Sequence, residues 1–455
     1  MKKDMTTGTE WKTLLLFSLP LMAGNLLQQL YNIVDGIIVG NFVGEAAFAS
    51  VATGQPLVFL YLALAIGMSV GVNIVVSQFF GAGKNDKLSV SIDTALILLG
   101  VLGILLTIFG VTMSEPLLRY LLNVHEEILH DAVVYMSIYS VGLFFTFMYN
   151  CIAAILRGFG DSKATLYFLL VATILSTILT LLFVPVFGWG VMGAAVSTVL
   201  AQATCAIVSF VYLRKKFPYQ KTDKHWDSAI AKTMAKLGAP IAVQMGVLSI
   251  GNAAMWRLVN NFEITVPGVV AAYGAAVRLD MIILVPIMGF QSGLASFVGQ
   301  NMGAGRLDRV KRGLHATVIM SLVITVLMSI VLYPLAEHIV GLFGLTDGSL
   351  QIGATMVRFM TLFFWIFSVY ITINGLLQGA GDTFILSIST LSALIIRVAM
   401  GYLSVSFGIL GHEAAWIPIP IGWALALVIS GIRYLTGGWK KKAIVGKNHI
   451  AKAEN

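Results

Sequence analysis

The stretch TLLLFSLPLMAGNLLQQLYNIVDGIIVGNFVG, residues 13–44, decides the fold, because it is long and apolar enough to span a membrane and yet carries a carboxylate, Asp35. At helical spacing, one polar stripe runs down this segment through Asn25, Gln28, Asn32 and Asp35. An aspartate at the centre of a spanning helix costs about 2.5–3.5 kcal/mol on insertion scales, so the stripe must face protein or water. We expect Asp35 to handle a proton or a cation; an aspartate hydrogen-bonded only for helix packing is the alternative.

The composition is that of a polytopic membrane protein. Of the 455 residues, 58% are hydrophobic and only 11% are charged, and the mean hydropathy is +0.89. The net charge of +8 does not indicate a nucleic-acid partner, because Lys and Arg cluster in short segments between apolar runs. Cys151 and Cys205 both fall inside apolar runs, so the sequence predicts neither a disulfide framework nor a metal site.

Twelve apolar runs have spanning length. Six come first, at 13–40, 51–79, 92–114, 131–156, 164–186 and 191–213, and six follow, at 234–259, 268–299, 314–341, 354–378, 384–407 and 412–436. We predict an N-terminal six-helix bundle at 1–213, a cytoplasmic linker at 214–232, a C-terminal six-helix bundle at 233–440 and a cytoplasmic tail at 441–455. Bends are expected at Pro20, Pro56 and Pro286.

The basic residues predict the orientation. Most of the 29 Lys and Arg residues lie in the N-terminal segment, in the linker, in the tail and in loops on the same side. By the positive-inside rule, both termini of this multi-pass protein are cytoplasmic, and the protein lies in the cell (cytoplasmic) membrane.

An internal repeat relates the two halves. GAGK at 81–84 recurs as GAGR at 303–306, and LRGFGD at 156–161 recurs as LQGAGD at 377–382. Because each half holds an even number of spans, the two bundles should have the same orientation and be related by a pseudo-two-fold axis along the membrane normal. This arrangement is typical of transporters.

Several short motifs do not predict chemistry. GMSVG at 67–71 matches a nucleophile elbow, but it lies inside an apolar span, where small residues four apart favour close helix packing. GAGK lacks the rest of a phosphate loop, and His412-Glu413 lacks the second histidine of a zinc motif. We therefore expect no enzyme activity, no cofactor and no metal site.

Charged and aromatic residues remain inside the second half. Arg278 and Asp280 fall in the eighth span and Arg397 in the eleventh. A buried charge network and a role in substrate binding are both open interpretations. Aromatic residues are dense in the fourth and tenth spans, where a subset could hold organic cations by cation–π attraction.

These features together resemble the multidrug and toxic compound extrusion (MATE) family of secondary transporters, over nearly the whole chain. The resemblance rests on SLP at 18–20, YNIVD at 31–35, the paired GAG and GxGD loops, GWG at 188–190 and VGQN at 298–301. It implies two six-helix bundles around a V-shaped central cavity and export of amphipathic, often cationic compounds, driven by inward flow of protons or sodium. It also implies that Asp35 couples transport to the ion.

The chain departs from the family pattern at two places. Many relatives carry an Asn and, four residues later, an Asp in the fifth span, where this chain has Ser176 and Thr180. The tenth span also lacks an acidic residue. A sodium site needs several oxygen ligands including carboxylates, whereas one carboxyl group can serve a proton, so protons are favoured over sodium.

We therefore expect a monomeric antiporter in contact with membrane lipid. The ion-coupling residues are expected to be Asp35, Asn32, Gln28 and Thr198. The candidates that line the substrate cavity are Asn25, Tyr31, Tyr149, Asn150, Gln244, Arg278, Asp280, Gln291, Phe363 and Tyr370. The alternatives are a flippase for lipid-linked precursors, which would need Arg residues converging on the cavity, and an intramembrane enzyme.

Overall fold

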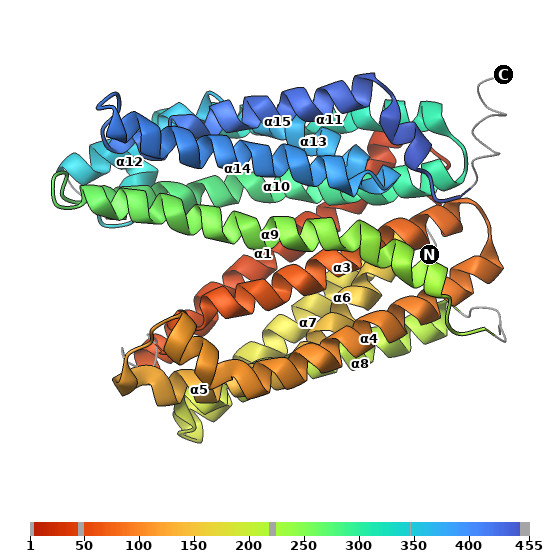
Figure 1. Ribbon diagram of the computed structural model, residues 1–455, viewed down its shortest axis with the longest axis horizontal. Coiled ribbons are helices and arrows are strands. Elements are labelled where there is room, and N and C mark those ends of the chain that lie inside the picture. Colours follow the sequence, from red (N-terminus) through yellow and green to blue (C-terminus); the bar gives the residue numbers. More distant parts are fainter. Residues whose placement is uncertain (1–3, 44–49, 218–223, 346, 446–455) are drawn as a thin grey trace. The chain divides into compact units, whose positions relative to one another are not determined.

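The computed structural model describes residues 4–43, 50–217, 224–345 and 347–445, except the side chains of 29–37, 39–41 and 347. Throughout these residues every regular element is a helix, which confirms the all-α fold (Figure 1). The first half contains α1 (Glu10–Phe42), α3 (Gln55–Gly81), α4 (Asn85–Pro116), α5 (Glu126–Val141), α6 (Leu143–Gly158), α7 (Ser162–Leu181) and α8 (Gly190–Lys216). Short π-helical turns, Leu117–Leu121 and Leu182–Val186, extend α4 and α7.

The second half repeats this order. It contains α9 (Ser228–Phe262), α10 (Val269–Gly303), α11 (Leu307–Gly341), α12 (Asp347–Thr361), α13 (Phe364–Ala380), α14 (Thr383–Ser406) and α15 (Pro418–Leu435). Two 3₁₀ turns, His412–Ala415 and Gly438–Lys442, flank α15. Each predicted span thus coincides with one helix or with one pair of consecutive helices.

The helices account for the twelve predicted spans. Nine described helices are long and apolar enough to cross a membrane, and two bent pairs raise the number to eleven. The 33-residue helix α1, whose side chains are described only in part, provides the twelfth span. The fold is therefore two bundles of six spans, and the axis relating them stays a prediction.

The two bent spans are equivalent members of the two halves. α5 and α6 meet at 43° and α12 and α13 at 52°. The first break falls at Gly142, where a Cβ atom would lie 2.9 Å from a methyl group of Val199. Neither break contains a proline. Pro56 lies in the first turn of α3, where the missing N–H needs no partner, and the bend expected there stays a prediction.

The chain forms two compact units, and their boundaries differ from those of the two halves of the sequence. Unit 1 comprises residues 1–4 and 19–243, and unit 2 comprises residues 5–18 and 244–455. The first turns of α1 therefore belong to unit 2, and the first half of α9 belongs to unit 1. The boundaries predicted at 213 and 233 stay a prediction.

Small residues allow the helices of each unit to pack closely. Such packing is expected in a membrane, because the hydrophobic effect does not hold helices together where the surrounding lipid is itself apolar. In unit 1, a Cβ on Gly158 of α6 would lie 2.9 Å from Val76 of α3. In unit 2, a Cβ on Gly379 of α13 would lie 2.8 Å from Val298 of α10. Gly158 and Gly379 are equivalent residues of the repeated loops, so the sequence repeat is also a repeat in packing.

Candidate functional site

The predicted ion-coupling stripe is only partly described. Asp35, Asn32 and Tyr31 lie outside the described side chains, so the roles expected for them stay predictions. Asn25, half-buried, and Gln28, exposed, lie on the described part of α1. The backbone of α1 is helical throughout residues 10–42, which keeps these residues at the spacing that the stripe requires.

Hydroxyl groups gather between α7 and α8 in unit 1. The Thr180 and Ser197 hydroxyls lie 2.6 Å apart, and the Thr198 hydroxyl donates to the carbonyl oxygen of Ala194 at 3.0 Å. Ser176, one turn before Thr180, is also buried. These groups are neutral, so the fifth-span residues Ser176 and Thr180 contribute hydroxyls to this place.

Five neighbouring side chains within the spans of unit 2 form what we call the Arg397 cluster. They are Asn252 and Trp256 of α9, Tyr273 and Asp280 of α10, and Arg397 of α14. The Arg397 guanidinium donates to the Tyr273 hydroxyl at 2.9 Å and to the Asn252 amide oxygen at 3.4 Å. The Trp256 ring packs edge-on against Tyr273, with ring centroids 4.9 Å apart. Three helices thus contribute polar side chains to one place.

Asp280 is the carboxylate of this cluster. Arg397 is the cation that acts electrostatically on Asp280, whereas Arg278 is exposed on another side of α10. Of the two partners expected for Asp280, the structure favours Arg397. Sequence reasoning singled out the charges but missed Asn252 and Tyr273, although Tyr273 lies seven residues before Asp280 and so on the same face of α10.

The other expected residues of unit 2 are dispersed. Tyr370 is buried, and its hydroxyl lies 3.5 Å from that of Thr390 in a hydrogen-bonded group with Asn374, Ser389 and Ser430. These last three, from α13, α14 and α15, were missed because single small polar residues carry no pattern. The remaining candidates are Gln244, which is buried, Gln291, whose amide lies 3.5 Å from Gln378, and Phe363, which packs on Phe359.

The candidates in the fourth span lie on α6. The Tyr149 hydroxyl is 3.5 Å from the carbonyl oxygen of Thr165, and the Asn150 amide donates to the carbonyl of Thr146 at 2.8 Å. Both side chains are half-buried. These bonds are compatible with a helix-packing role, and the expected contact of both residues with substrate stays a prediction.

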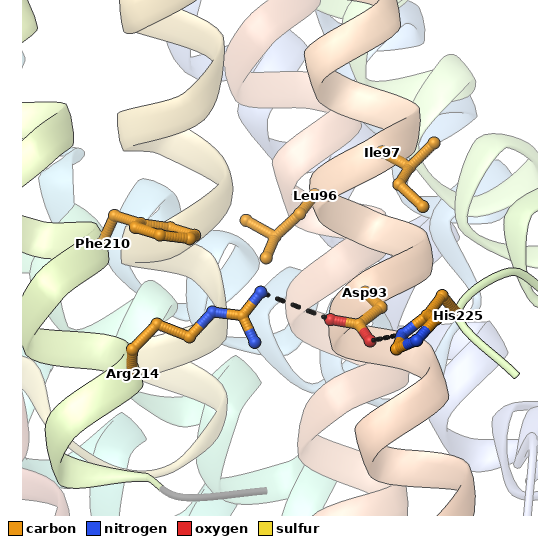
Figure 2. Close-up of a pocket in the computed structure, with 6 residues that line it drawn as sticks. All are labelled: Asp93, Leu96, Ile97, Phe210, Arg214 and His225. Atoms are coloured by element: carbon orange, nitrogen blue, oxygen red, sulfur yellow. Dashed lines mark hydrogen bonds and ion pairs between the residues drawn. The ribbon is translucent and has the colours of Figure 1, made fainter. Parts of the chain in front are cut away.

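A pocket of about 360 Å³ lies at the end of unit 1 where α4 begins and α8 ends (Figure 2). Its lining consists of Asp93, Leu96, Ile97, Phe210, Arg214 and His225. Figure 2 shows Asp93 between Arg214 and His225: one carboxylate oxygen is 2.7 Å from His225 Nδ1 and the other is 3.7 Å from Arg214. The buried carboxylate thus has two cationic or potentially cationic partners.

The residues of this pocket show why the sequence did not predict it. Asp93 was counted as part of an apolar span, and His225 lies 132 residues further on, in the predicted linker. The backbone N–H of Asp227 also donates to the Thr94 hydroxyl at 3.0 Å. The segment before α9 is therefore bound to α4, and the pocket lies beside that attachment.

The described residues contain no group of three or more His, Cys, Asp or Glu side chains placed to hold a metal ion. The candidate residues of the two units are polar and aromatic side chains borne by helices within the spans. Such groups bind and orient a solute, and proton transfer needs only a carboxyl group that can titrate.

Comparison with known proteins agrees with this arrangement. The sequence profile of the MatE family matches residues 20–182 and 240–403. The chain is 30% identical to the probable multidrug resistance protein YpnP of Bacillus subtilis (strain 168), over 96% of this chain and 97% of that protein. It is 26% identical to the FAD transporter of Shewanella oneidensis, over 73% of this chain and 74% of that protein.

A solved structure shares the fold. It is described as the outward-facing conformation of a multidrug resistance MATE family transporter, and it superposes with a TM-score of 0.88 at 23% identity, over 97% of this chain and 99% of that one. The profile match covers both halves of the chain, and the match to YpnP covers nearly all of it. The chain therefore belongs to the MatE family of multi-pass membrane transporters for multidrug efflux.

Proposed function

We propose that this protein is a secondary antiporter of the bacterial cytoplasmic membrane that exports small amphipathic compounds, including organic cations, in exchange for protons. Alternating access of a site within the spans performs the exchange, with both termini in the cytoplasm. The family membership supports export, and YpnP is named as a probable multidrug resistance protein.

The hydroxyl pair of Thr180 and Ser197 is the observation that supports protons over sodium. Sodium is a hard cation that is held by several oxygens, usually with a carboxylate among them. The fifth span offers neutral hydroxyls at 2.6 Å from each other, at the place where many relatives carry a carboxylate. Asp35 is then the proposed coupling group on its own, and a single carboxyl group is sufficient for a proton.

Coupling requires that protonation favours one conformation over the other, because a ligand shifts an equilibrium only by its differential affinity for the two states. The membrane potential contributes about 2.3 kcal/mol per charge per 100 mV. At 100 mV, one inward proton therefore moves one neutral compound outward against a gradient of more than about tenfold. A monovalent cation exchanged for one proton moves no net charge, so its export is driven by the pH gradient alone.

Ethidium accumulation in inside-out vesicles tests this function. A vesicle with an acidic interior should accumulate ethidium in sodium-free buffer, and a protonophore should abolish the accumulation. A sodium gradient of the same size should have no effect. Accumulation that follows sodium and ignores the protonophore would overturn proton coupling, and accumulation that follows neither gradient would overturn the antiporter.

A second candidate function is export of anionic amphipathic compounds. Arg397 favours it: its Nε atom is buried without a hydrogen-bond partner among the described residues, while its other nitrogens are bound to neutral groups. An unpaired donor of this kind suits a phosphate or carboxylate. The relative named as an FAD transporter is consistent with such a solute, and a lipid-linked precursor is a further example.

The two functions differ in what they predict for flavin nucleotides, which only an exporter of anions carries, and one variant tests this. If the substrate is anionic, Arg397→Gln should abolish export of flavin nucleotides and leave ethidium export unchanged. If the substrates are cationic, Arg397→Gln should leave or improve ethidium export, because one positive charge is removed. Competition of FAD with ethidium in the wild-type protein distinguishes a shared site from separate ones.

A further inference from the structure

The pocket at the end of unit 1 has no part in the proposed exchange of substrate and proton. Its lining residues come from α4, from α8 and from residue 225, all of which belong to unit 1 (Figure 2). Small-molecule sites have volumes of about 300–1,000 Å³, and this pocket has about 360 Å³. It is therefore large enough for a ligand the size of a lipid headgroup.

The charged residues of the pocket lie where the hydrocarbon core of a membrane would end. Asp93 is at the start of the apolar run 92–114, and Arg214 directly follows the apolar run 191–213. Each run has the length that crosses a bilayer, so its end lies at the level of the lipid headgroups. This holds for either orientation of the chain in the membrane. The phosphate groups of lipids therefore lie at the depth of the pocket.

Asp93 orients two basic side chains at the accessible side of the pocket. The Asp93 side chain is only 7% exposed, and its carboxylate oxygens lie 2.7 Å from His225 Nδ1 and 3.7 Å from the Arg214 guanidinium (Figure 2). The Arg214 and His225 side chains are 37% and 65% exposed. A ligand that enters the pocket thus meets the basic groups first, and the buried carboxylate keeps them in place.

Phe210 contacts the Arg214 guanidinium as well. The guanidinium carbon lies 5.1 Å from the centroid of the Phe210 ring, which is a cation–π contact. A guanidinium oriented by a carboxylate and an aromatic ring loses less side-chain freedom when it binds an anion. Its planar arrangement of N–H groups matches two oxygens of a phosphate. Arg214 is therefore the residue of the pocket best suited to a phosphate group.

The apolar lining of the pocket continues along the outside of unit 1. On α4, the lining residue Ile97 and the residues Val101 and Ile104 share one helical face, and all three are exposed. On α8, the exposed residue Ile207 lies one turn before Phe210. Exposed apolar faces of spanning helices contact lipid chains. A molecule with its polar end in the pocket can thus lay an acyl chain along α4 and α8.

We propose that this pocket binds an anionic phospholipid, with the phosphate at Arg214 and His225 and an acyl chain along the exposed faces of α4 and α8. Basic pockets between spanning helices are typical sites for such headgroups. Inorganic phosphate would match the basic residues but not the apolar lining, and an organic cation would be repelled by Arg214. The proposal depends neither on which compound the protein exports nor on which ion drives export.

Native mass spectrometry of the delipidated protein with dioleoyl phosphatidylglycerol tests the site. The tightest site of the wild-type protein should prefer this lipid about tenfold over dioleoyl phosphatidylcholine, which has the same chains but no net charge. An excess of inorganic phosphate should not displace the bound lipid, because phosphate lacks the chains. Equal binding of the two lipids, or displacement by inorganic phosphate, would overturn the proposal.

A pair of neighbouring variants separates the pocket from general surface charge. Arg214→Gln should weaken phosphatidylglycerol binding by at least about tenfold, because it removes charged hydrogen bonds to the phosphate. Lys215→Gln removes the same charge from an exposed residue that does not line the pocket, and it should cost no more than about fivefold, the contribution of one basic residue near a membrane surface. Equal losses in both variants would overturn the assignment to the pocket.

Ile97→Trp fills the pocket without a change of charge and keeps the test decisive if Arg214→Gln does not fold. This variant should lose the preference for phosphatidylglycerol over phosphatidylcholine. Wild-type lipid binding by Ile97→Trp, or a loss of ethidium binding in its place, would overturn the proposal. These measurements use purified protein without a gradient, so their failure leaves the proposed antiport untouched. A failure of ethidium export would likewise leave the lipid site untouched.

Discussion

Asp161 and Asp382 occupy equivalent positions in the two repeats, and each accepts a hydrogen bond from a side chain 51 residues further along the chain. Tyr212 donates to Asp161 at 2.8 Å, and Arg433 donates to Asp382 at 2.5 Å. Lys216 also binds Asp161 at 2.7 Å. These bonds hold the last helix of each half to the repeated loop. The donor is a tyrosine in the first half and an arginine in the second.

The Asp161 bonds predict a pH-dependent stability. Burial alone would raise the pKa of Asp161, but hydrogen bonds from Lys216, Tyr212 and the backbone of Ala164 outweigh it and hold the pKa below its usual value. The unfolded-state pKa is about 3.9, so the stabilisation is complete above that pH and is lost as the pH falls through the lower folded-state pKa.

Asp161→Asn should therefore lower the thermal unfolding temperature at pH 7, by an amount equivalent to about 1–3 kcal/mol, and the difference from wild type should shrink below about pH 4. Thermal unfolding in detergent across pH 3–8 measures this. Asp86→Asn, at an exposed carboxylate, is the control. An unfolding temperature difference that is the same at pH 7 and pH 3 would contradict the assignment.

The contact of Gly71 with α9 predicts opposite outcomes for two glycine substitutions. Gly71→Ala should reduce the amount of folded protein, because the methyl group overlaps the Met234 carbonyl. Gly431→Ala, in α15, has open space at its Cβ and should stabilise by about 0.5–1 kcal/mol, the helix preference of Ala over Gly. Fluorescence-detected gel filtration after heating compares the two. Equal stability of both variants would show that α9 tolerates displacement from α3.

The negative charge of Asp280 should offset the repulsion between Arg397 and a cationic substrate. We expect Asp280→Asn to raise the KM for ethidium by about fivefold, a change of about 1 kcal/mol, with little change in folded yield. The double variant Asp280→Asn/Arg397→Gln removes both charges and should recover most of the affinity. A KM that is unchanged in Asp280→Asn, or that does not recover in the double variant, would argue against compensation between the two charges.

Some features could be predicted from the sequence because they are local or repeated. Apolar runs identified every span, and the paired loops revealed two related halves, since both signals are carried by consecutive residues. The bend at Gly142 was missed because no local pattern marks it; Val199, which approaches Gly142 closely, lies on another helix. The assignment of the first turns of α1 to unit 2, and of the first half of α9 to unit 1, was also missed, because helix packing depends on residues far apart in the chain.

The candidate site was predictable to a smaller extent. Charged residues such as Asp280 and Arg397 stand out against apolar sequence, and the structure brings both to one cluster. Asn252 and Tyr273 gain their importance only from contact with Arg397, which no spacing within one helix shows. Asp93 was overlooked because it stands near the start of a span, where a charge is usually solvated.

The measurement that tests the central claim most directly is substrate-induced proton movement by the purified protein in liposomes that contain a pH-sensitive dye. When ethidium is added outside liposomes that hold the wild-type protein in sodium-free buffer, ethidium should enter in exchange for protons that leave. The internal pH should therefore rise. Asp35→Asn, which keeps the side-chain size and hydrogen bonding but cannot titrate, should reconstitute equally well and show no proton movement. Wild-type proton movement that requires sodium, or full proton movement in Asp35→Asn, would contradict the claim that Asp35 couples efflux to protons.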